Sequence, residues 1–118
     1  MEFNKDKAIF LQIADMLFES ILTDKWKEEE RVPSVREMAV SVEVNPNTVL
    51  RTYGYLQEND IIFNRRGMGY FVSAEAKEKI KTIKREQFVK TELPQIVATM
   101  KLLGIDFDEL KSLYEDNH

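Results

Sequence analysis

The chain has 118 residues, of which 43% are hydrophobic and 32% are charged, and its formal net charge is −4. This length allows one domain with a modest extension, and the sequence has no run of about 18 apolar residues that could span a membrane. The chain has no cysteine, which excludes disulfides and thiolate chemistry, and its N-terminus lacks the pattern of a secretory signal, so we expect a cytoplasmic protein.

The first predicted element is an amphipathic helix over residues 8–22. Isoleucine and leucine recur there at four-residue steps, which is the spacing of one helix face. The stripe consists of Ile9, Ile13, Leu17 and Ile21. A charged connector follows over residues 25–31, and Trp26 is its single large apolar residue. We expect this tryptophan to cover the core rather than to bind a ligand.

Two short helices are predicted next. Ser34 with a glutamate three residues later has the pattern of a capping box, which predicts a helix from there to about residue 42. Asn45 suits an N-cap and Pro46 suits the first helical position, so another helix is predicted from there to about residue 59. Its apolar stripe consists of Val49, Leu50, Tyr53 and Leu56. Two short helices separated by about three residues indicate a helix-turn-helix.

A β-hairpin is predicted after these helices. Residues 61–63 and 70–72 are short runs of β-prone side chains, and the loop between them, residues 64–69, is basic and contains two glycines. This pattern is typical of a hairpin. A helix-turn-helix followed directly by a hairpin predicts a winged helix.

A helical tail follows the hairpin. Residues 74–103 are rich in helix formers and predict one long helix, in which Pro94 predicts a kink or a restart. Gly104 is expected to end this helix. Asp106, with a glutamate three residues later, predicts the cap of a last helix that runs to about Tyr114.

Together these elements predict an α+β fold that is mostly α-helical. Residues 7–74 are expected to form a winged helix-turn-helix of three helices and a β-hairpin wing. Residues 75–118 are expected to form a short two-helix C-terminal tail. The sequence shows no internal repeat and no low-complexity segment.

Four motifs in this order and spacing resemble the GntR family of bacterial regulators. They are FLQIA at residues 10–14, VPSVREMA at 32–39, VNPNTV at 44–49 and RRGMGYFV at 65–72. The resemblance covers roughly residues 7–74, and the short tail is similar to that of the YtrA subfamily. The resemblance implies a dimer that binds operator DNA, acts as a repressor and uses residues 7–74 as its DNA-binding domain.

The resemblance also implies which residues contact DNA. The family uses the arginine of the second helix, the start of the third helix and the wing tip. The third helix, about residues 45–58, would enter the major groove, and the wing, residues 64–69, would enter the adjacent minor groove. The predicted DNA-binding residues are Ser34, Arg36, Asn45, Asn47, Thr48, Arg51, Arg65, Arg66 and Gly67.

The residue types at these positions support a DNA contact, although each has a plainer interpretation. Asn47 is a weak helix former in a first turn, where exposed polar groups reach bases. Arg36 could instead be a solvated helix residue paired with a carboxylate. Arg65 and Arg66 could be ordinary turn residues, but a basic tip with a glycine suits the negative potential of the minor groove. Lys5 and Lys7 are further candidates for backbone contacts.

Charge places a condition on DNA binding. Residues 1–74 hold nine Lys/Arg and twelve Asp/Glu, and residues 75–118 hold eight and nine. Because neither part is basic in bulk, the positive charge must gather on one face. A winged helix allows this, since Arg36, Arg51, Arg65 and Arg66 can lie on the same side.

Two positions depart from the family pattern. Glu43 stands in the turn between the two short helices, where family members often have glycine. If that position requires a positive φ, the glutamate costs about 1 kcal/mol or more. Leu50 stands where many members have arginine, so one DNA contact of the family is missing here. We therefore expect the operator to differ from a family consensus.

The tail is expected to form the dimer, because its apolar stripe has no partner within so short a segment. The predicted dimerisation residues are Phe88, Leu93, Ile96, Val97, Met100 and Leu103. A small-molecule effector is a further expected partner of unknown chemistry. Since such sites usually need about 300 Å³ or more, the tail can hardly enclose one alone, and the dimer or the head–tail junction would have to contribute.

The sequence lacks the groups that catalysis requires. It has no cysteine, and its single histidine, His118, is terminal. It has no phosphate-cradling glycine-rich loop and no cluster with metal-ligand spacing, so we expect no enzyme and no cofactor. The chief alternative is a winged helix that binds protein, but such modules lack a basic wing and a polar start of the recognition helix.

Overall fold

The computed structural model describes residue 3 and residues 7–116. The chain divides into two compact units, residues 1–81 and residues 82–118. Below we call residues 1–81 the head, and from here on the tail means residues 82–118, which begin seven residues after the tail expected from the sequence. No helix in the described part of the chain is long and apolar enough to span a membrane.

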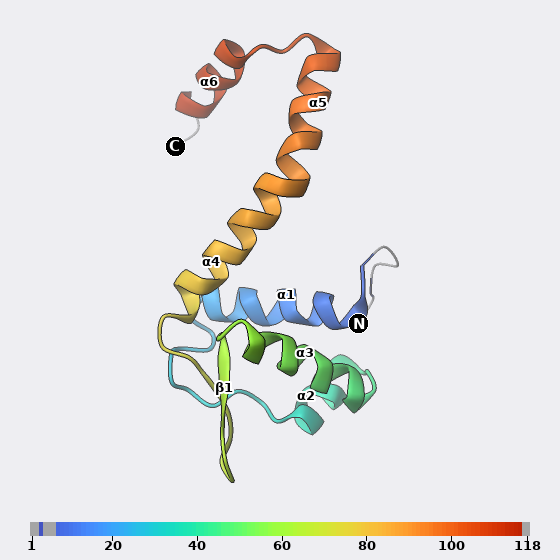
Figure 1. The fold of residues 1–118 in the computed structure, drawn as a ribbon, viewed down its shortest axis with the longest axis vertical. Coiled ribbons are helices and arrows are strands. Elements are labelled where there is room, and N and C mark those ends of the chain that lie inside the picture. Colours follow the sequence, from blue (N-terminus) through green and yellow to red (C-terminus); the bar gives the residue numbers. More distant parts are fainter. Residues whose placement is uncertain (1–2, 4–6, 117–118) are drawn as a thin grey trace. The chain divides into compact units, whose positions relative to one another are not determined.

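The first helix of the head, α1 (Ile9–Leu22), has the predicted amphipathic pattern. Ile13, Leu17 and Ile21 are buried, whereas Ile9 at its first turn is exposed. Helix α1 packs against α3 (Pro46–Glu58), which also contacts α2 (Val35–Val42). Figure 1 shows α1 along one side of α3, and α2 close to the end where α3 begins.

Helices α2 and α3 begin where the capping patterns predict. The side chain of Ser34 accepts a hydrogen bond from the backbone N–H of Glu37 (3.1 Å), and the Glu37 carboxylate accepts one from the backbone N–H of Ser34 (3.1 Å). Asn45 Oδ1 accepts the backbone N–H of Asn47 (2.8 Å), and Pro46 occupies the first turn of α3. These bonds satisfy backbone donors that a helix start leaves open.

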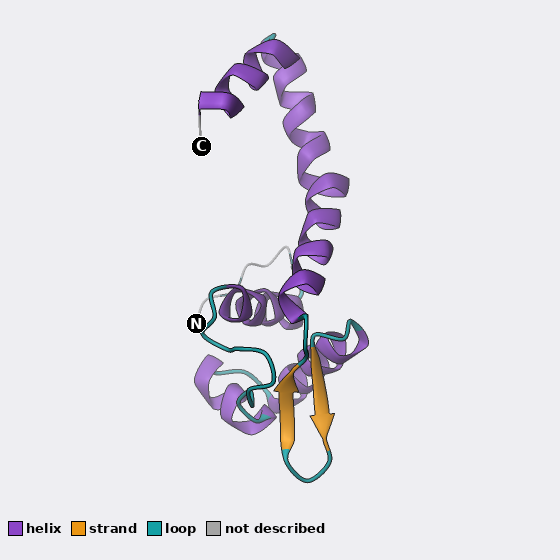
Figure 2. Ribbon diagram, turned by 90° about the vertical axis from the view of Figure 1, so that its left-hand side faces the viewer, coloured by secondary structure: helices purple, strands orange, loops and turns teal. Residues whose placement is uncertain are grey.

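The wing is an antiparallel pair of strands, β1 (Ile62–Arg65) and β2 (Gly69–Val72). Figure 2 shows the two strands in orange, joined by one short loop. The register pairs Ile62 with Val72 and Arg65 with Gly69. The strands are slightly longer than the β-prone runs predicted, because cross-strand pairing extends into the polar residues next to the loop.

The core of the head lies between α1, α3 and the base of the wing. Its largest fully buried side chains include Tyr53, Phe18, Ile13, Ile21 and Leu56. The Tyr53 hydroxyl donates to the carbonyl of Pro33 (2.6 Å), and its ring contacts that of Tyr70 edge to face. Burial raises the pKa of Tyr53 well above its ordinary value. This single side chain therefore ties α3 to the start of α2 and to the wing.

Helix α4 (Ala76–Gln87) begins in the head, where Ala76 and Ile80 are buried. The chain continues through a π-helical turn, η1 (Phe88–Glu92), into α5 (Leu93–Leu103). The predicted interruption is thus a π turn directly before Pro94. A proline ring clashes with the carbonyl four residues earlier, and a wider turn is one way to relieve that clash.

The last helix, α6 (Phe107–Asp116), follows a short corner. Gly104 ends α5 with a left-handed φ of 72°, and the backbone N–H of Ile105 donates to the carbonyl of Met100 (2.9 Å). Asp106 Oδ1 accepts the backbone N–H of Glu109 (2.9 Å), which is the predicted cap. The predicted fold class, a mostly helical winged helix with C-terminal helices, is confirmed.

Candidate nucleic-acid interface

The start of α3 presents the residues predicted to read bases. Asn47 is exposed, and Thr48 is half-buried. The Asn45 oxygen is used in the cap, which leaves its amide nitrogen able to donate outward. One polar face is therefore available at the N-terminal end of the helix, the end that enters the major groove in helix-turn-helix proteins.

Leu50 does not belong to the buried stripe of α3, and the sequence-based assignment of this residue was wrong. Val49, Tyr53 and Leu56 are fully buried, but the Leu50 side chain is 52% exposed. At 100° per residue, Leu50 lies about 60° from Asn47 but about 100–120° from Val49 and Leu56, at the edge of the buried stripe toward the polar start. It is an apolar group on the face that carries the polar start.

Arg51 is held in place by an aromatic ring of α1. Its guanidinium carbon lies 4.0 Å from the centre of the Phe10 ring, a distance typical of a cation–π contact. Phe10 also contacts Tyr55 edge to face. Arg51 is exposed. Because its guanidinium lies over the Phe10 ring, its charge has a defined position beside the N-terminal half of α1. Sequence reasoning did not predict this contact.

Helix α2 supplies one exposed arginine and a fixed N-terminus. Arg36 is exposed and forms no ion pair or side-chain hydrogen bond with the residues that the structure describes. The hydrogen bonds from the Ser34 backbone and side chain hold the pKa of Glu37 below its ordinary value, and the charge of Arg31 adds to this shift. The Ser34 hydroxyl, predicted to contact DNA, serves the capping box here.

The turn between α2 and α3 requires a left-handed residue, as the departure from the family pattern suggested. Glu43 ends α2 with φ 57° and ψ 48°. A side chain costs roughly 1–2 kcal/mol in this conformation relative to glycine. Glu43 is thus a strained residue at the point where the chain turns from α2 toward α3.

The wing tip is a tight turn that separates its two arginines. The backbone N–H of Met68 donates to the carbonyl of Arg65 (2.8 Å), and Gly67 has a φ of 78°. The guanidinium of Arg65 lies 4.8 Å from the Phe71 ring, so this side chain stacks on the strand surface. Arg66 is exposed at the tip and has no ion pair within the described residues. The tip therefore carries one stacked and one open arginine.

Arg31 lies beside the wing, and sequence reasoning missed it. Its Nε donates to the carbonyl of Met68 (3.2 Å), and its backbone forms a bridge with Phe71. In the sequence it follows three glutamates and reads as part of a charged connector. No local signal marks it, because only the return of the connector alongside β2 brings it to the wing.

Three further positions complete the comparison with the sequence. Lys7, a candidate for a DNA backbone contact, forms an ion pair with Asp15 of α1, so its charge already has a partner within the head. Lys5 and His118 lie outside the described residues. Among the residues that the structure describes, no group of three or more His, Cys, Asp or Glu side chains could hold a metal ion.

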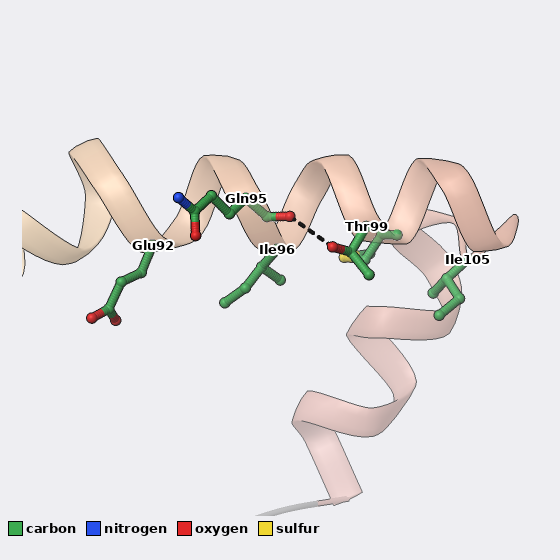
Figure 3. Close-up of a pocket in the computed structure, with 6 residues that line it drawn as sticks. Glu92, Gln95, Ile96, Thr99 and Ile105 are labelled. Carbon is green, nitrogen blue, oxygen red and sulfur yellow. Dashed lines mark hydrogen bonds between the residues drawn. The ribbon is translucent and has the colours of Figure 1, made fainter. Parts of the chain in front are cut away.

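The predicted dimerisation residues lie on the tail, where no described side chain is buried. Phe88, Ile96, Val97 and Leu103 are exposed, while Leu93 and Met100 are partly covered. An open groove of about 390 Å³ runs between α5 and the corner that leads to α6. Figure 3 shows Ile96 and Ile105 pointing into this groove from the two sides. Glu92, Gln95, Thr99 and Met100 complete its lining.

Comparisons with known proteins agree with this geometry. Residues 10–72 match the family model for bacterial regulatory proteins of the gntR family. The chain is 38% identical over 109 residues to the HTH-type transcriptional regulator YhcF of Bacillus subtilis, covering 92% of this chain and 88% of YhcF. It is 32% identical over 102 residues to the HTH-type transcriptional repressor YtrA of the same organism, covering 86% and 78%.

Solved structures show the same relationship over nearly the whole chain. A transcriptional regulator of the GntR family from Bacteroides thetaiotaomicron superposes with a TM-score of 0.81 at 44% identity, covering 92% of this chain and 95% of the other. The similarity includes the tail as well as the winged helix.

Proposed function

Since this chain belongs to the GntR family of DNA-binding transcription regulators, we propose that it is a dimeric repressor that reads a two-fold-symmetric operator. In this proposal α3 enters the major groove and the wing enters the adjacent minor groove. The observation that carries it is the pair of exposed arginines on α2 and the wing, Arg36 and Arg66, together with the exposed polar start of α3.

The chemistry of α3 supports direct reading of bases. An amide side chain such as that of Asn47 can both donate and accept at the edge of a base pair in the major groove. The cap at Asn45 fixes the first turn of the helix, the bond from Tyr53 to Pro33 ties the helix to the start of α2, and the Tyr53 ring contacts Tyr70 of the wing. A rigid helix start allows a polar side chain to discriminate between bases instead of adapting to each.

The arginines of the head reconcile DNA binding with a negative net charge. Every positively charged residue from 31 to 74 is an arginine, and all of them lie on the connector end, α2, α3 or the wing. None forms an ion pair with the carboxylates of the described residues. Their charge thus remains available for phosphates and for the negative potential of a minor groove.

We propose that a second copy of this chain covers the tail. Its exposed apolar side chains extend along α5 and α6, with Leu102 84% and Tyr114 79% exposed. A helical segment without a buried core gains no hydrophobic stabilisation by itself. A symmetric pair would bury these side chains against each other and place two recognition helices about 34 Å apart, which is one turn of DNA.

The name of YtrA, a repressor, supports a repressor rather than an activator for this chain. A protein that binds operators acts where the chromosome lies, so we place it in the cytoplasm. In this arrangement the tail positions the two heads, and occupation of the operator blocks transcription.

Binding to DNA tests this proposal directly. Duplexes selected from a random pool by the full-length protein should contain two related half-sites, and their affinity should fall steeply with salt as counterions are released. Arg36→Ala or Arg66→Ala should weaken binding by about 1–3 kcal/mol without unfolding the head. Lys25→Ala, which removes an exposed charge from the connector, should bind nearly as tightly as the wild type.

Two results would contradict the proposal. Selection of sites without two-fold symmetry, together with a monomer in sedimentation at micromolar concentration, would exclude the dimer. Unchanged binding by both arginine variants would exclude the assigned contact surface.

A further inference from the structure

The connector before α2 forms part of the wing. The backbone N–H of Val32 donates to the carbonyl of Tyr70 (2.9 Å), and the N–H of Val72 donates to the carbonyl of Glu30 (2.9 Å). Arg31, between them, forms an antiparallel bridge with Phe71. The connector thus lies beside β2 as a short third strand, opposite β1.

This pairing fixes the direction of the Arg31 side chain. Residues directly opposite each other in an antiparallel pair point to the same face, so Arg31 shares a face with Phe71. Along β1, Phe63 pairs with Phe71 and Arg65 pairs with Gly69. One face of the wing therefore carries two aromatic rings with an arginine on each outer strand.

Gly69 leaves room for the Arg31 guanidinium near the turn. A Cβ at this position would lie 3.2 Å from Arg31 Nε, and the glycine has a φ of 107°. The same Nε donates to the carbonyl of Met68 (3.2 Å). The guanidinium is thereby held beside Gly69 near the tip of the wing, although the Arg31 backbone pairs with Phe71, two residues closer to the base.

We propose that Arg31 is a further DNA-binding residue, which braces the wing turn through Met68 and binds a backbone phosphate with the rest of its guanidinium. This inference rests on the proposed placement of the wing in a groove of DNA. It goes beyond that proposal because neither the motifs nor their spacing point to Arg31.

The remaining donors of Arg31 suit a phosphate. A guanidinium has five N–H donors in a planar fork that matches phosphate oxygens, and one of them is used at Met68. Arg31 is exposed and forms no ion pair with the carboxylates that the structure describes. Besides the hydrogen bonds with Ser34, the charge of Arg31 also contributes, as the smallest cause, to the lowered pKa of Glu37. A wing that enters a groove has phosphates along both of its edges, and Arg31 lies on one edge.

The test compares Arg31→Ala, Arg31→Gln and Arg31→Lys with the wild type on one selected duplex, across a range of salt concentrations. For the alanine and glutamine variants we expect affinity to fall on the order of tenfold. The slope of log affinity against log salt should become shallower by about 0.9 per lost phosphate contact, and therefore by about 2 for a dimer. Arg31→Lys keeps the charge, so it should retain the wild-type slope while losing a few-fold in affinity.

Two controls separate the possible outcomes. Lys25→Ala removes one charge from the same connector and should leave the slope unchanged. Thermal unfolding checks each variant; if the alanine variant is destabilised, the comparison of Arg31→Lys with Arg31→Gln still isolates the charge at this position.

The results also distinguish this inference from the proposal on which it rests. Weaker binding by Arg66→Ala with a wild-type slope for Arg31→Gln would overturn the role of Arg31 alone. Wild-type binding by both variants would overturn the placement of the wing in DNA. A loss of affinity in all three Arg31 variants without a change in slope would reduce Arg31 to a structural brace.

Discussion

The head and the tail differ in whether their helices enclose buried side chains. The buried side chains of the described chain all lie between Ile13 and Ile80, within the head, and none lies in residues 82–116. The tail nevertheless forms regular helices with defined ends at Gly104 and Asp106. Local capping and helix propensity are thus sufficient to shape the tail, but a core is present only in the head. The head therefore has its own source of hydrophobic stabilisation, whereas the exposed apolar side chains of the tail are what motivates the proposed dimer.

The largest expected effect comes from placing a charge on the exposed face of the tail. Val97→Asp should dissociate the proposed dimer and lower operator affinity by about 10²- to 10⁴-fold, because each head then binds its half-site separately. The head should remain folded, since its core does not include this residue. Sedimentation and fluorescence anisotropy measure the two effects.

Gln87→Asp provides the matched control, because it places the same charge at an exposed polar position of the same helical run. It should remain dimeric. A Val97→Asp protein that stays dimeric and binds normally would break the comparison between the two regions.

The next largest effect is the loss of stability expected when a cavity is created in the core of the head. Leu56→Ala removes a fully buried side chain of α3, and we expect it to lower the free energy of unfolding by about 2–5 kcal/mol. Val40→Ala, at an α2 position that is 75% exposed, should change it by less than about 0.5 kcal/mol. Chemical denaturation followed by circular dichroism measures both. Equal losses in the two variants would mean that the head's core is not the source of its stability.

A smaller and opposite effect is expected at the turn between α2 and α3. Glu43→Gly should raise the free energy of unfolding by about 1 kcal/mol, because glycine adopts the observed φ of 57° without steric cost. Ser41→Gly, at an exposed position inside α2, should lower stability instead. Destabilisation by Glu43→Gly would show that contacts of the glutamate side chain outweigh its backbone strain.

The smallest effect depends on pH and concerns the cap of α2. The folded-state pKa of Glu37 lies below its ordinary value, chiefly through hydrogen bonds with Ser34. The ionised carboxylate therefore stabilises the head above the ordinary glutamate pKa, and this contribution is lost as the pH falls through the lowered pKa. Glu37→Gln should be less stable than the wild type at pH 7, and the two melting temperatures should converge under acidic conditions. A difference that is independent of pH would exclude this linkage.

Most elements of the fold could be predicted because their signals are local. The capping box at Ser34, the Asn45–Pro46 start and the Gly104 end each involve residues within a few positions of one another. The motifs of residues 10–72 were sufficient to identify the family, and the family match confirms that identification. The individual DNA contacts remain predictions.

One wrong assignment and one unpredicted contact concern residues of α3. Leu50 was assigned to the buried stripe because it is apolar and adjacent to Val49, yet it faces outward. Arg51 was predicted only as a positive charge, and its stacking on Phe10 depends on the packing of α1 against α3. The stacking of Arg51 has no signature within a short window of sequence, whereas the outward position of Leu50 is consistent with the helical period.

The sequence by itself determined where α2 and α3 begin, where α5 ends and where α6 is capped, because hydrogen-bonding caps and glycines act over a few residues. The tertiary structure alone decided which charges meet at the wing. Arg31 and Met68 are 37 positions apart, and they come together only because the connector returns alongside β2. The tail shows the same division, since the caps of its helices are specified locally, whereas the proposed cover of its apolar side chains depends on contacts between chains.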